Sequence, residues 1–292
     1  MVLALPSSLS PSKVASFTEC ALAFRFSAID RLPDPPTVAT VRGTLVHAAL
    51  ERLFLLEPHE RTPGAGQASQ QEARLELATD PEALELGLDP EGEAALVAEA
   101  SVLVERYFEL EDPTAIRPIG LELKLEADVE GLRVRGIIDR LELDDDGELI
   151  VTDYKSGRSP GERYEQSRLG GVHFYAFLCE RVLGRRPARV QLLYLGDGVT
   201  IRTVPSDQSI RALERKVRAI WMAIERACER DDFRPRTSRL CDYCAYQAWC
   251  PAFGGDPEGA RVEAARLAAA AAGEVAAVTD GTAVAVPVAS PA

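Results

Sequence analysis

The chain has 292 residues, and its apolar content of 46 % is enough for a full hydrophobic core in one large domain or two small ones. Its formal net charge of −13 does not exclude a nucleic-acid partner, because the acidic side chains are unevenly distributed along the chain. Residues 51–112 carry 16 acidic and 4 basic side chains, whereas residues 153–240 carry 18 basic and 11 acidic ones. No segment is apolar enough to span a membrane and no secretory signal is visible, so we expect a cytoplasmic protein.

The N-terminal third is predicted to be helical. Ser10 as N-cap and Pro11 at the first helical position begin a helix that we expect to run to about residue 30. Further helices are expected over about 41–56 and 91–110. Between them, residues 58–90 are rich in Pro, Gly, Gln and Glu, and are predicted to form an acidic loop insertion with a short helical piece.

The centre of the chain is predicted to form a small mixed sheet with flanking helices. Strands are expected near 119–129, 133–143, 148–155, 189–195 and 199–204, with helices over 164–184 and 207–230. This order predicts an α/β fold. We expect one folded domain over residues 1–253 and a disordered tail, rich in Ala, Gly and Val, over residues 254–292.

Three charged residues in the second and third strands carry the strongest chemical signal. Asp139 lies in an apolar strand, where an unpaired carboxylate is costly to bury. Asp153 and Lys155 share one face of the next strand, because residues two apart point the same way. The acidic turn at 144–147 can fold the strands into a hairpin that brings Asp139 beside them. Two carboxylates and an ammonium suit metal-assisted phosphodiester hydrolysis with Mg²⁺ or Mn²⁺.

An exposed hairpin with ordinary solvated charges would show the same short motif. Only four of the 33 basic residues are lysines, which favours a specific role for Lys155. The surplus positive charge of residues 153–240 suits phosphate binding, although an Arg-rich helical surface would give the same balance.

The cysteines suggest a metal centre, because disulfides are rare in the expected compartment. Cys241, Cys244 and Cys250 form a knuckle without a local fourth ligand, and Cys20 lies over 200 residues upstream. Four thiolates suit a 4Fe–4S cluster that would clasp the chain ends together. The alternative is a Zn²⁺ ion held by the C-terminal triplet and another ligand, with Cys20 buried in its helix. Two further cysteines, at positions 179 and 228, fall in apolar helical patterns and are expected in the core.

Five motifs in order resemble the RecB-type branch of the PD-(D/E)xK nuclease superfamily, in the iron–sulfur subset that includes the AddB nuclease domain. The resemblance covers Leu9 to Pro251. The motifs are Ser10-Pro11-Ser12 with Cys20 and Phe24, Gly43 to His47, Gly136 to Asp139, Asp153 to Lys155 followed by Ser156-Gly157, and the C-terminal cysteine triplet.

The resemblance implies a restriction-endonuclease-like core and roles for single residues. It implies that His47, Asp139 and Asp153 bind Mg²⁺ or Mn²⁺ together with the Tyr154 carbonyl, and that Lys155 activates or positions the water. Glu122 is implied to lie behind the ligands. The family's usual Gln-x-x-x-Tyr is incomplete, because Gly171 precedes Tyr175 by four residues. Two alternatives stay open: Gln166 or His173 supplies the DNA contact of the missing glutamine, or this contact is absent.

The implied function is a metal-dependent exonuclease acting on single-stranded DNA ends in repair or recombination. The chain has no Gly-x-x-x-x-Gly-Lys-Ser/Thr motif, so a helicase motor would be a separate partner. One alternative is a non-catalytic DNA-end-binding protein or an accessory subunit of a helicase-nuclease. Another is a structure-specific endonuclease or an RNA nuclease.

Overall fold

A computed structural model describes the backbone of residues 3–160 and 162–280, and the side chains of residues 3–160 and 171–270. These residues form two compact units. We call Leu5–Ala15 with Pro35–Ala227 the sheet unit, and Met1–Ala4, Ser16–Asp34 and Cys228–Ala292, as far as they are described, the cysteine unit. The folded part that the sequence predicted as one domain over 1–253 is divided between the two.

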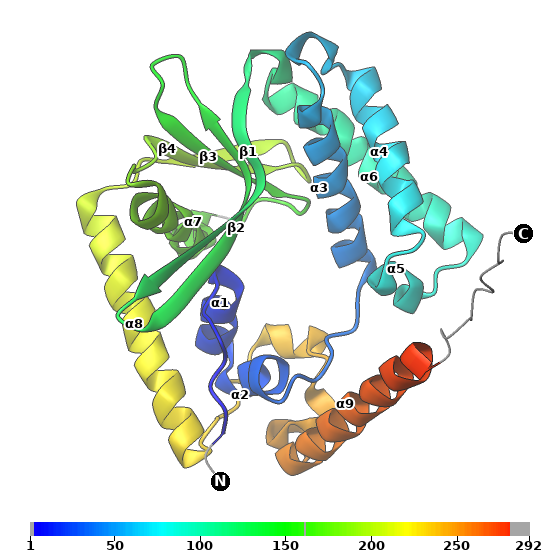
Figure 1. The fold of residues 1–292 in the computed structure, drawn as a ribbon, viewed down its shortest axis with the longest axis vertical. Helices are drawn as coiled ribbons and strands as arrows, with labels where there is room; N and C mark the ends of the chain where they lie inside the picture. The colour runs from blue at the N-terminus through cyan, green and yellow to red at the C-terminus, as the bar shows by residue number, and fades with distance from the viewer. Residues whose placement is uncertain (1–2, 161, 281–292) are drawn as a thin grey trace, which may run out of the picture. The chain divides into compact units, whose positions relative to one another are not determined.

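A five-stranded mixed sheet forms the centre of the sheet unit (Figure 1), which confirms the predicted α/β class. Its order is β1-β2-β3-β4-β5, and only the β3–β4 pair is parallel. Helix α7 connects these two strands, as a parallel pair requires. The elements are β1 (Arg117–Val129), β2 (Leu132–Leu143), β3 (Leu149–Lys155), α7 (Glu162–Leu183), β4 (Arg189–Tyr194) and β5 (Val199–Thr203).

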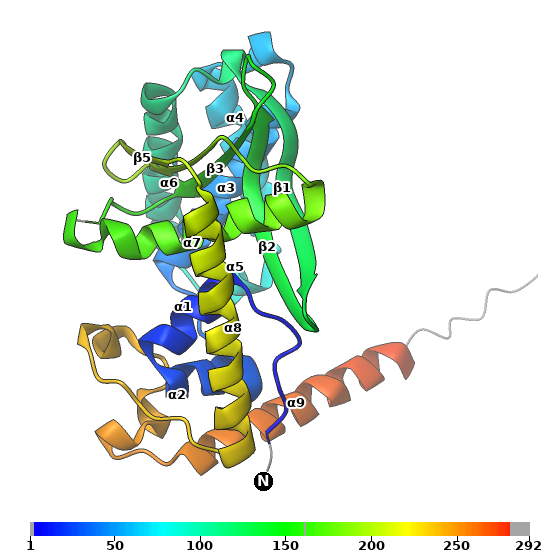
Figure 2. The same cartoon turned by 90° about the vertical axis from the view of Figure 1, so that its left-hand side faces the viewer.

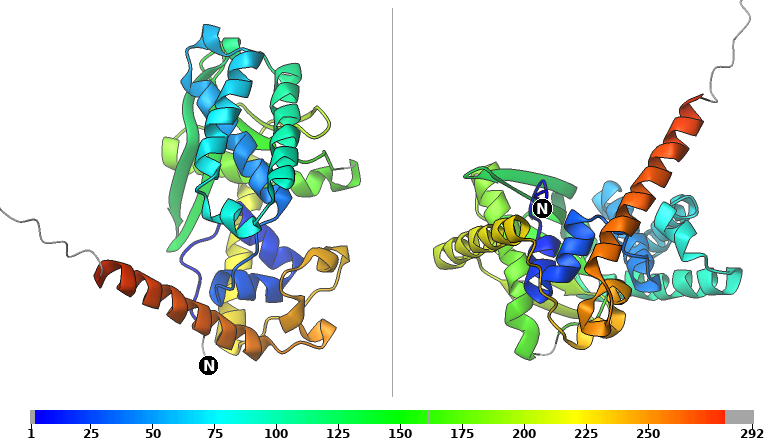
Figure 3. Two further views of the ribbon diagram at one scale, coloured as in Figure 1. Left: turned by 90° about the vertical axis from the view of Figure 1, so that its right-hand side faces the viewer. Right: turned by 90° about the horizontal axis from the view of Figure 1, so that it is seen from below.

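Helices cover both faces of this sheet (Figures 1 and 2). Helix α7 packs against β1, β2 and β4 on one face. On the other face lies α3 (Val38–Leu55), with α4 (Pro63–Leu77) and α6 (Pro90–Leu110) packed against it (Figure 3). Their shared apolar core includes Leu50, Tyr107, Tyr154 and Leu193. The amphipathic helix α8 (Asp207–Arg230) has the bounds that the sequence predicted.

The predicted loop over residues 58–90 is wrong, because most of this segment is helical. Helices α4 and α5 (Pro81–Leu86) each begin with a proline and are capped by the side chains of Thr62 and Asp80. Gln70 is fully buried and donates a hydrogen bond to the Val97 carbonyl of α6 at 2.8 Å. Packing against α6 therefore stabilises a polar sequence that shows little apolar periodicity.

The predicted helix from residue 10 to 30 is interrupted at Cys20, which is extended with φ −155° and ψ 108°. The break turns the thiol toward Arg236, whose backbone N–H lies 3.5 Å from Cys20 Sγ. The resulting elements are α1 (Pro11–Glu19), α2 (Ala21–Phe24) and a π-helical turn (Arg25–Ile29). Three 3₁₀ turns follow near the C-terminal cysteines, Arg239–Tyr243, Gln247–Trp249 and Pro251–Phe253. Cys241 lies in the first turn, Cys244 directly follows it, and Cys250 lies between the second and the third.

The predicted disorder from residue 254 is wrong for α9 (Pro257–Asp280). Alanine is the strongest helix former, and the Asp256 side chain accepts a hydrogen bond from the Glu258 backbone at the helix start. Gly259 packs closely on the Trp249 ring, 2.8 Å from where a Cβ would lie. Residues 281–292 are outside the described residues. In the described chain, no helix has the length and apolarity needed to cross a membrane.

Candidate active site

Side chains from three elements converge at one end of the sheet. His47 of α3, Glu122 of β1 and Asp139 of β2 present ligand atoms that all lie within 4.8 Å of one another. His47 Nδ1 is 3.6 Å from Asp139 Oδ2 and 3.8 Å from Glu122 Oε1. The structure thus brings His47 and Asp139 together, as the sequence motifs implied. The carboxylate of Glu122 faces the same space as these two side chains, so Glu122 does not lie behind them.

The backbone of Glu122 explains its position. Its φ is +43°, in the left-handed region that non-glycine residues seldom adopt. The β1–β2 ladder pairs Leu121 with Arg140 and Leu123 with Ile138, so the regular pairing is interrupted at Glu122, opposite Asp139. Such strain costs on the order of 1–3 kcal/mol and is concentrated at functional sites. No sequence pattern signals it, which is why the sequence did not place Glu122 among the ligands.

Strand β3 brings the Asp-x-Lys motif to the same place. Lys155 Nζ forms an ion pair with Asp153 Oδ2. The backbone N–H of Tyr154, between them, donates to Asp139 Oδ2 at 2.6 Å. The His47 ring packs edge-on against the Tyr154 ring, with centroids 5.9 Å apart. The hairpin therefore brings Asp139 beside the motif, as its turn and alternation predicted.

Negative charge at this site is only partly compensated. Burial, and then the charge of Asp153, raise the pKa of Asp139 to about 7, against the opposing effect of His47. Burial alone would lower the pKa of His47, but Glu122 and the two aspartates outweigh it and raise that pKa. A carboxyl group next to an ionised carboxylate resists ionisation, and a nearby cation stabilises its ionised form. Carboxylate oxygens with one imidazole nitrogen are a donor set that fits a divalent metal.

The thermal stabilisation by Mn²⁺ should depend on pH. The folded-state pKa values of both Asp139 and His47 are raised, so the stability that their protonated forms contribute is lost as pH rises, for Asp139 through about 7. Metal binding needs both groups deprotonated, so Mn²⁺ should raise the melting temperature more at about pH 8 than at about pH 6. Melting curves with and without Mn²⁺ check this. An equal rise at both pH values, or the same pH dependence in Asp139→Asn, would contradict it.

Helix α7 approaches the carboxylates through Tyr175. Burial raises the pKa of Tyr175, and the charge of Asp153 and a hydrogen bond between the two side chains raise it further. Gly136 makes room for this contact, since a Cβ there would lie 2.9 Å from Leu178 and 3.4 Å from Tyr175. The side chain of Gln166 is outside the described residues. Gly171 is surrounded by open space and supplies no contact.

Gly136→Ala should displace α7 and lower both stability and cleavage rate. The added methyl group meets Leu178 below any ordinary contact distance, and overpacking of this kind costs about 1–3 kcal/mol. Gly171→Ala, in α7 itself, is the matched control. It meets nothing and should stabilise the protein by about 0.5–1 kcal/mol through helix propensity. Chemical denaturation of both variants measures the difference, and an unaffected Gly136→Ala protein would show that α7 does not pack there as described.

A fully buried arginine supports the site from the opposite face of the sheet. Arg140 follows Asp139 in β2, and its guanidinium donates to the Tyr154 hydroxyl at 2.8 Å and to Glu111 Oε2 at 2.8 Å. It also forms an ion pair with Glu142 and lies over the Phe54 ring, 4.6 Å from the centroid. No local sequence pattern signals this network, because its members come from α3, the end of α6, β2 and β3. The arginine therefore links β2 and β3 on the face of the sheet opposite to Asp139.

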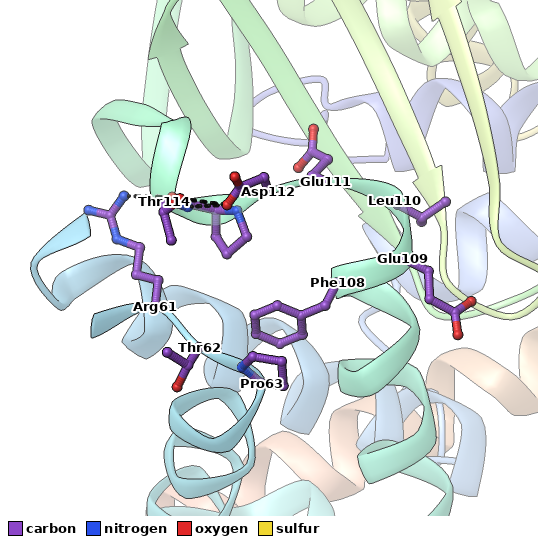
Figure 4. A pocket seen from close by; sticks show the side chains of 10 residues that line it. Arg61, Thr62, Pro63, Phe108, Glu109, Leu110, Glu111, Asp112 and Thr114 are labelled. Carbon is purple, nitrogen blue, oxygen red and sulfur yellow. Dashed lines mark hydrogen bonds between the residues drawn. The ribbon is translucent and has the colours of Figure 1, made fainter. Parts of the chain in front are cut away.

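The sheet unit also has an open pocket of about 510 Å³ near the end of α6 (Figure 4). None of the converging residues lines it. Its Arg61 donates hydrogen bonds to the backbone carbonyls of Leu56, Pro113 and Ile116, at 3.0, 3.1 and 2.9 Å. The hydrogen bonds of Arg61 thus stabilise the wall of the pocket. The side chains that could bind a metal ion, His47, Glu122 and Asp139, lie outside it.

The four cysteines of the predicted cluster lie together in the cysteine unit. Cys20, Cys241, Cys244 and Cys250 line one small cavity and form no disulfide. Burial raises the pKa of Cys244 against the opposing effect of a hydrogen bond from the Tyr246 backbone, and the charges of the other three thiols add to the rise. The Ser238 backbone N–H lies 3.4 Å from Cys241 Sγ and can donate to a thiolate. The remaining cysteines, at positions 179 and 228, are buried as predicted.

Three comparisons with known proteins bear on this geometry. The model of the PD-(D/E)XK nuclease superfamily matches residues 8–251. The Gene 69 protein of Mycobacterium phage D29 is 25 % identical over 178 residues, which are 53 % of this chain and 65 % of that protein, just under two thirds of its length. A crystal structure of a "Putative exonuclease" from Eubacterium rectale shares the fold, with a TM-score of 0.50 and 13 % identity over 82 % of this chain and 88 % of that one.

The family match contains every one of the converging residues and the cysteine knuckle. It covers most of the chain, and the observed mixed sheet with its acidic end agrees with it. The chain therefore belongs to the PD-(D/E)XK nuclease superfamily.

Proposed function

We propose that this protein is a metal-dependent deoxyribonuclease that degrades single-stranded DNA from its ends, in DNA repair or recombination. The observation that supports this best is the convergence of His47, Glu122 and Asp139 beside the Asp153–Lys155 pair, in a chain of this nuclease superfamily. A helicase, if one acts with it, would be a separate partner, since this chain carries no phosphate-binding loop motif.

His47, Glu122, Asp139 and Asp153 are the side chains that would hold Mg²⁺ or Mn²⁺, with the Tyr154 carbonyl as a further proposed ligand. The cation would supply positive charge against the negative charge that develops on the phosphate, and would make the attacking water more acidic. Asp139 is held in place for this role by the Tyr154 N–H on one of its oxygens. Glu122 is proposed as a direct ligand, because its carboxylate oxygen lies within 4.8 Å of the ligand atoms of His47 and Asp139.

Lys155 is proposed to position the water and to neutralise the reacting phosphate. Burial lowers the pKa of Lys155, but the charge of Asp153 and the hydrogen bond between them outweigh it and raise that pKa. The side chain is 41 % exposed, so the ammonium can meet a substrate while Asp153 orients it. A protonated lysine donates hydrogen bonds and cannot accept the proton of the water.

Exonuclease action is proposed from the fold that the chain shares with the "Putative exonuclease" of Eubacterium rectale. Linear end-labelled single-stranded DNA and covalently closed circular single-stranded DNA should be compared in Mn²⁺. An exonuclease degrades the linear substrate and leaves the circle intact. Cleavage of the circle would favour the endonuclease alternative, and preference for an RNA strand the RNA nuclease. Binding of linear DNA without cleavage would favour the non-catalytic alternative.

We also propose a 4Fe–4S cluster on Cys20, Cys241, Cys244 and Cys250. The four thiols share one cavity. Four cysteine thiolates are the ligand set of such a cluster.

The cluster is tested by purifying the protein without oxygen. Iron and inorganic sulfide in equal amounts, with a broad absorption band in the blue, are expected. Colourless protein with one zinc ion per chain would overturn the proposal. Cys20→Ser should lose the iron, whereas Cys179→Ser should keep it, because Cys179 is buried in the sheet unit and does not line this cavity.

A further inference from the structure

The turn that contains Cys241 and leads into Cys244 presents two large side chains to solvent. Residues Arg239–Tyr243 form a 3₁₀ turn that leads into Cys244. Because a 3₁₀ helix has three residues per turn, residues three apart share a side. Leu240 and Tyr243 therefore share one side, and Cys241 and Cys244 share another. Tyr243 is 89 % exposed and Leu240 57 %, whereas the two cysteines are half-buried at their cavity.

The cysteine side of this turn is held firmly. The Ser238 hydroxyl accepts a hydrogen bond from the Leu240 N–H at 3.2 Å, and the Ser238 N–H reaches Cys241 Sγ. The Gln247 side chain donates to the Cys241 carbonyl. Tyr243 thus projects from a short capped turn, so little conformational freedom is lost when a ligand packs on its ring.

A nearby tyrosine shows the contrasting case. Tyr246, three residues further on, is 7 % exposed and packs against the Phe26 ring with centroids 5.7 Å apart. Tyr246 therefore contributes to the core of the cysteine unit, whereas the ring of Tyr243 has almost no contacts of that kind. A lone exposed aromatic side chain is common on protein surfaces, so its neighbours decide what it means.

The neighbours of Tyr243 are predominantly basic. The segment 233–250 contains three arginines and a single acid, Asp242. Arg234 is paired with Asp232, and the Arg236 guanidinium is bound to the Thr18 carbonyl. Arg239 is exposed at the start of the turn, and in the described part of the chain its side chain forms no ion pair. Exposed aromatic and aliphatic surface next to an arginine complements an unpaired base and its phosphate.

We infer that Tyr243 and Leu240 form a stacking platform for an unpaired base of single-stranded DNA, with Arg239 contacting the adjacent phosphate. This inference rests on the proposed function and specifies how the chain holds its substrate. Stacking uses the face of the base, which paired bases in a duplex do not expose, so the platform selects single strands without selecting a sequence.

The test measures binding of the full-length protein to labelled oligothymidylate by fluorescence anisotropy, without added divalent metal so that no cleavage occurs. Tyr243→Ser should weaken binding by about 10- to 100-fold, and Tyr243→Phe, which keeps the ring, by no more than about twofold. Arg239→Ala should reduce the slope of log affinity against log salt by about one phosphate contact. Leu84→Ser, an equally exposed apolar position in α5, is the control and should change nothing.

An oligonucleotide with abasic sites identifies the stacked group directly. The wild type should bind it about as weakly as Tyr243→Ser binds oligothymidylate, and Tyr243→Ser should not distinguish the two. Wild-type affinity in Tyr243→Ser, with unchanged metal content, would overturn the platform, and would also be the result if Tyr243 served a protein partner. Tighter binding of oligouridylate would overturn the assignment to DNA. Cleavage by the wild type in these cases would leave the proposed function standing.

Discussion

Replacing Lys155 with alanine should lower the rate of DNA cleavage by about 10³-fold, the size of effect seen when a single donor to developing negative charge is removed. Lys155 is the cation paired with Asp153 at the acidic end of the sheet. Without it, the water and the phosphate lose a charged donor. The affinity for single-stranded DNA should change little, because Lys155 is one of 18 basic side chains over residues 153–240.

Single-turnover cleavage of a labelled oligonucleotide measures this effect. Lys124→Ala is the matched control, because Lys124 is an exposed lysine of β1 in the same sheet. Melting curves should accompany both variants, since Lys155→Ala also leaves the buried Asp153 without its partner. Cleavage by Lys155→Ala at the wild-type rate would show that this site is not where the phosphodiester bond is hydrolysed.

Arg140→Met should reduce the free energy of unfolding by about 3–5 kcal/mol, because it leaves the partners of a buried charge uncompensated. Arg140 is fully buried and paired with Glu111 and Glu142, whose side chains are 10 % and 8 % exposed. Burial raises the pKa of Glu142, and the charge of Arg140 opposes that rise. The loss should appear as a melting temperature lower by roughly 10 °C, given about 2–4 °C per kcal/mol in a protein of this size.

A second set of variants separates charge from packing. Adding Glu111→Gln and Glu142→Gln to Arg140→Met removes the uncompensated carboxylates and should restore part of the lost stability. Arg133→Met, on the same strand but 60 % exposed, should change stability by no more than about 0.5 kcal/mol. If Arg140→Met is as stable as the wild type, the buried network does not hold β2 and β3 together.

The strands and α8 could be predicted because their signals are local. Alternation with period two in the first half of β2 and the acidic turn at 144–147 are visible within a few residues. Both are confirmed by the burial pattern of β2 and by its pairing with β3. The helices of residues 58–90 could not, because the packing of Gln70 and Ala73 against α6 stabilises them and their own periodicity is weak. The break at Cys20 likewise depends on a thiol contact more than 200 residues away in sequence.

Part of the candidate site could also be predicted from the sequence. The motifs containing His47, Asp139 and the Asp153–Lys155 pair identified the group that the structure brings together. The sequence did not predict that Glu122 lies beside His47 and Asp139. This position depends on a left-handed backbone conformation at Glu122, which a glutamate in a sequence does not indicate. The Arg140 network was missed because its partners are spread over α6, β2 and β3, and only the folded chain juxtaposes them.

The most direct test of the proposed catalytic site pairs metal dependence with a single ligand substitution. Cleavage of linear single-stranded DNA should be measured for the wild type and for Asp139→Asn, in Mn²⁺ and in excess chelator. The wild type should cleave only in Mn²⁺. Asp139→Asn should keep its fold but neither cleave nor bind Mn²⁺ by calorimetry, because it replaces a carboxylate of the converging group with a neutral amide. Mn²⁺-dependent cleavage by Asp139→Asn at the wild-type rate would contradict the account.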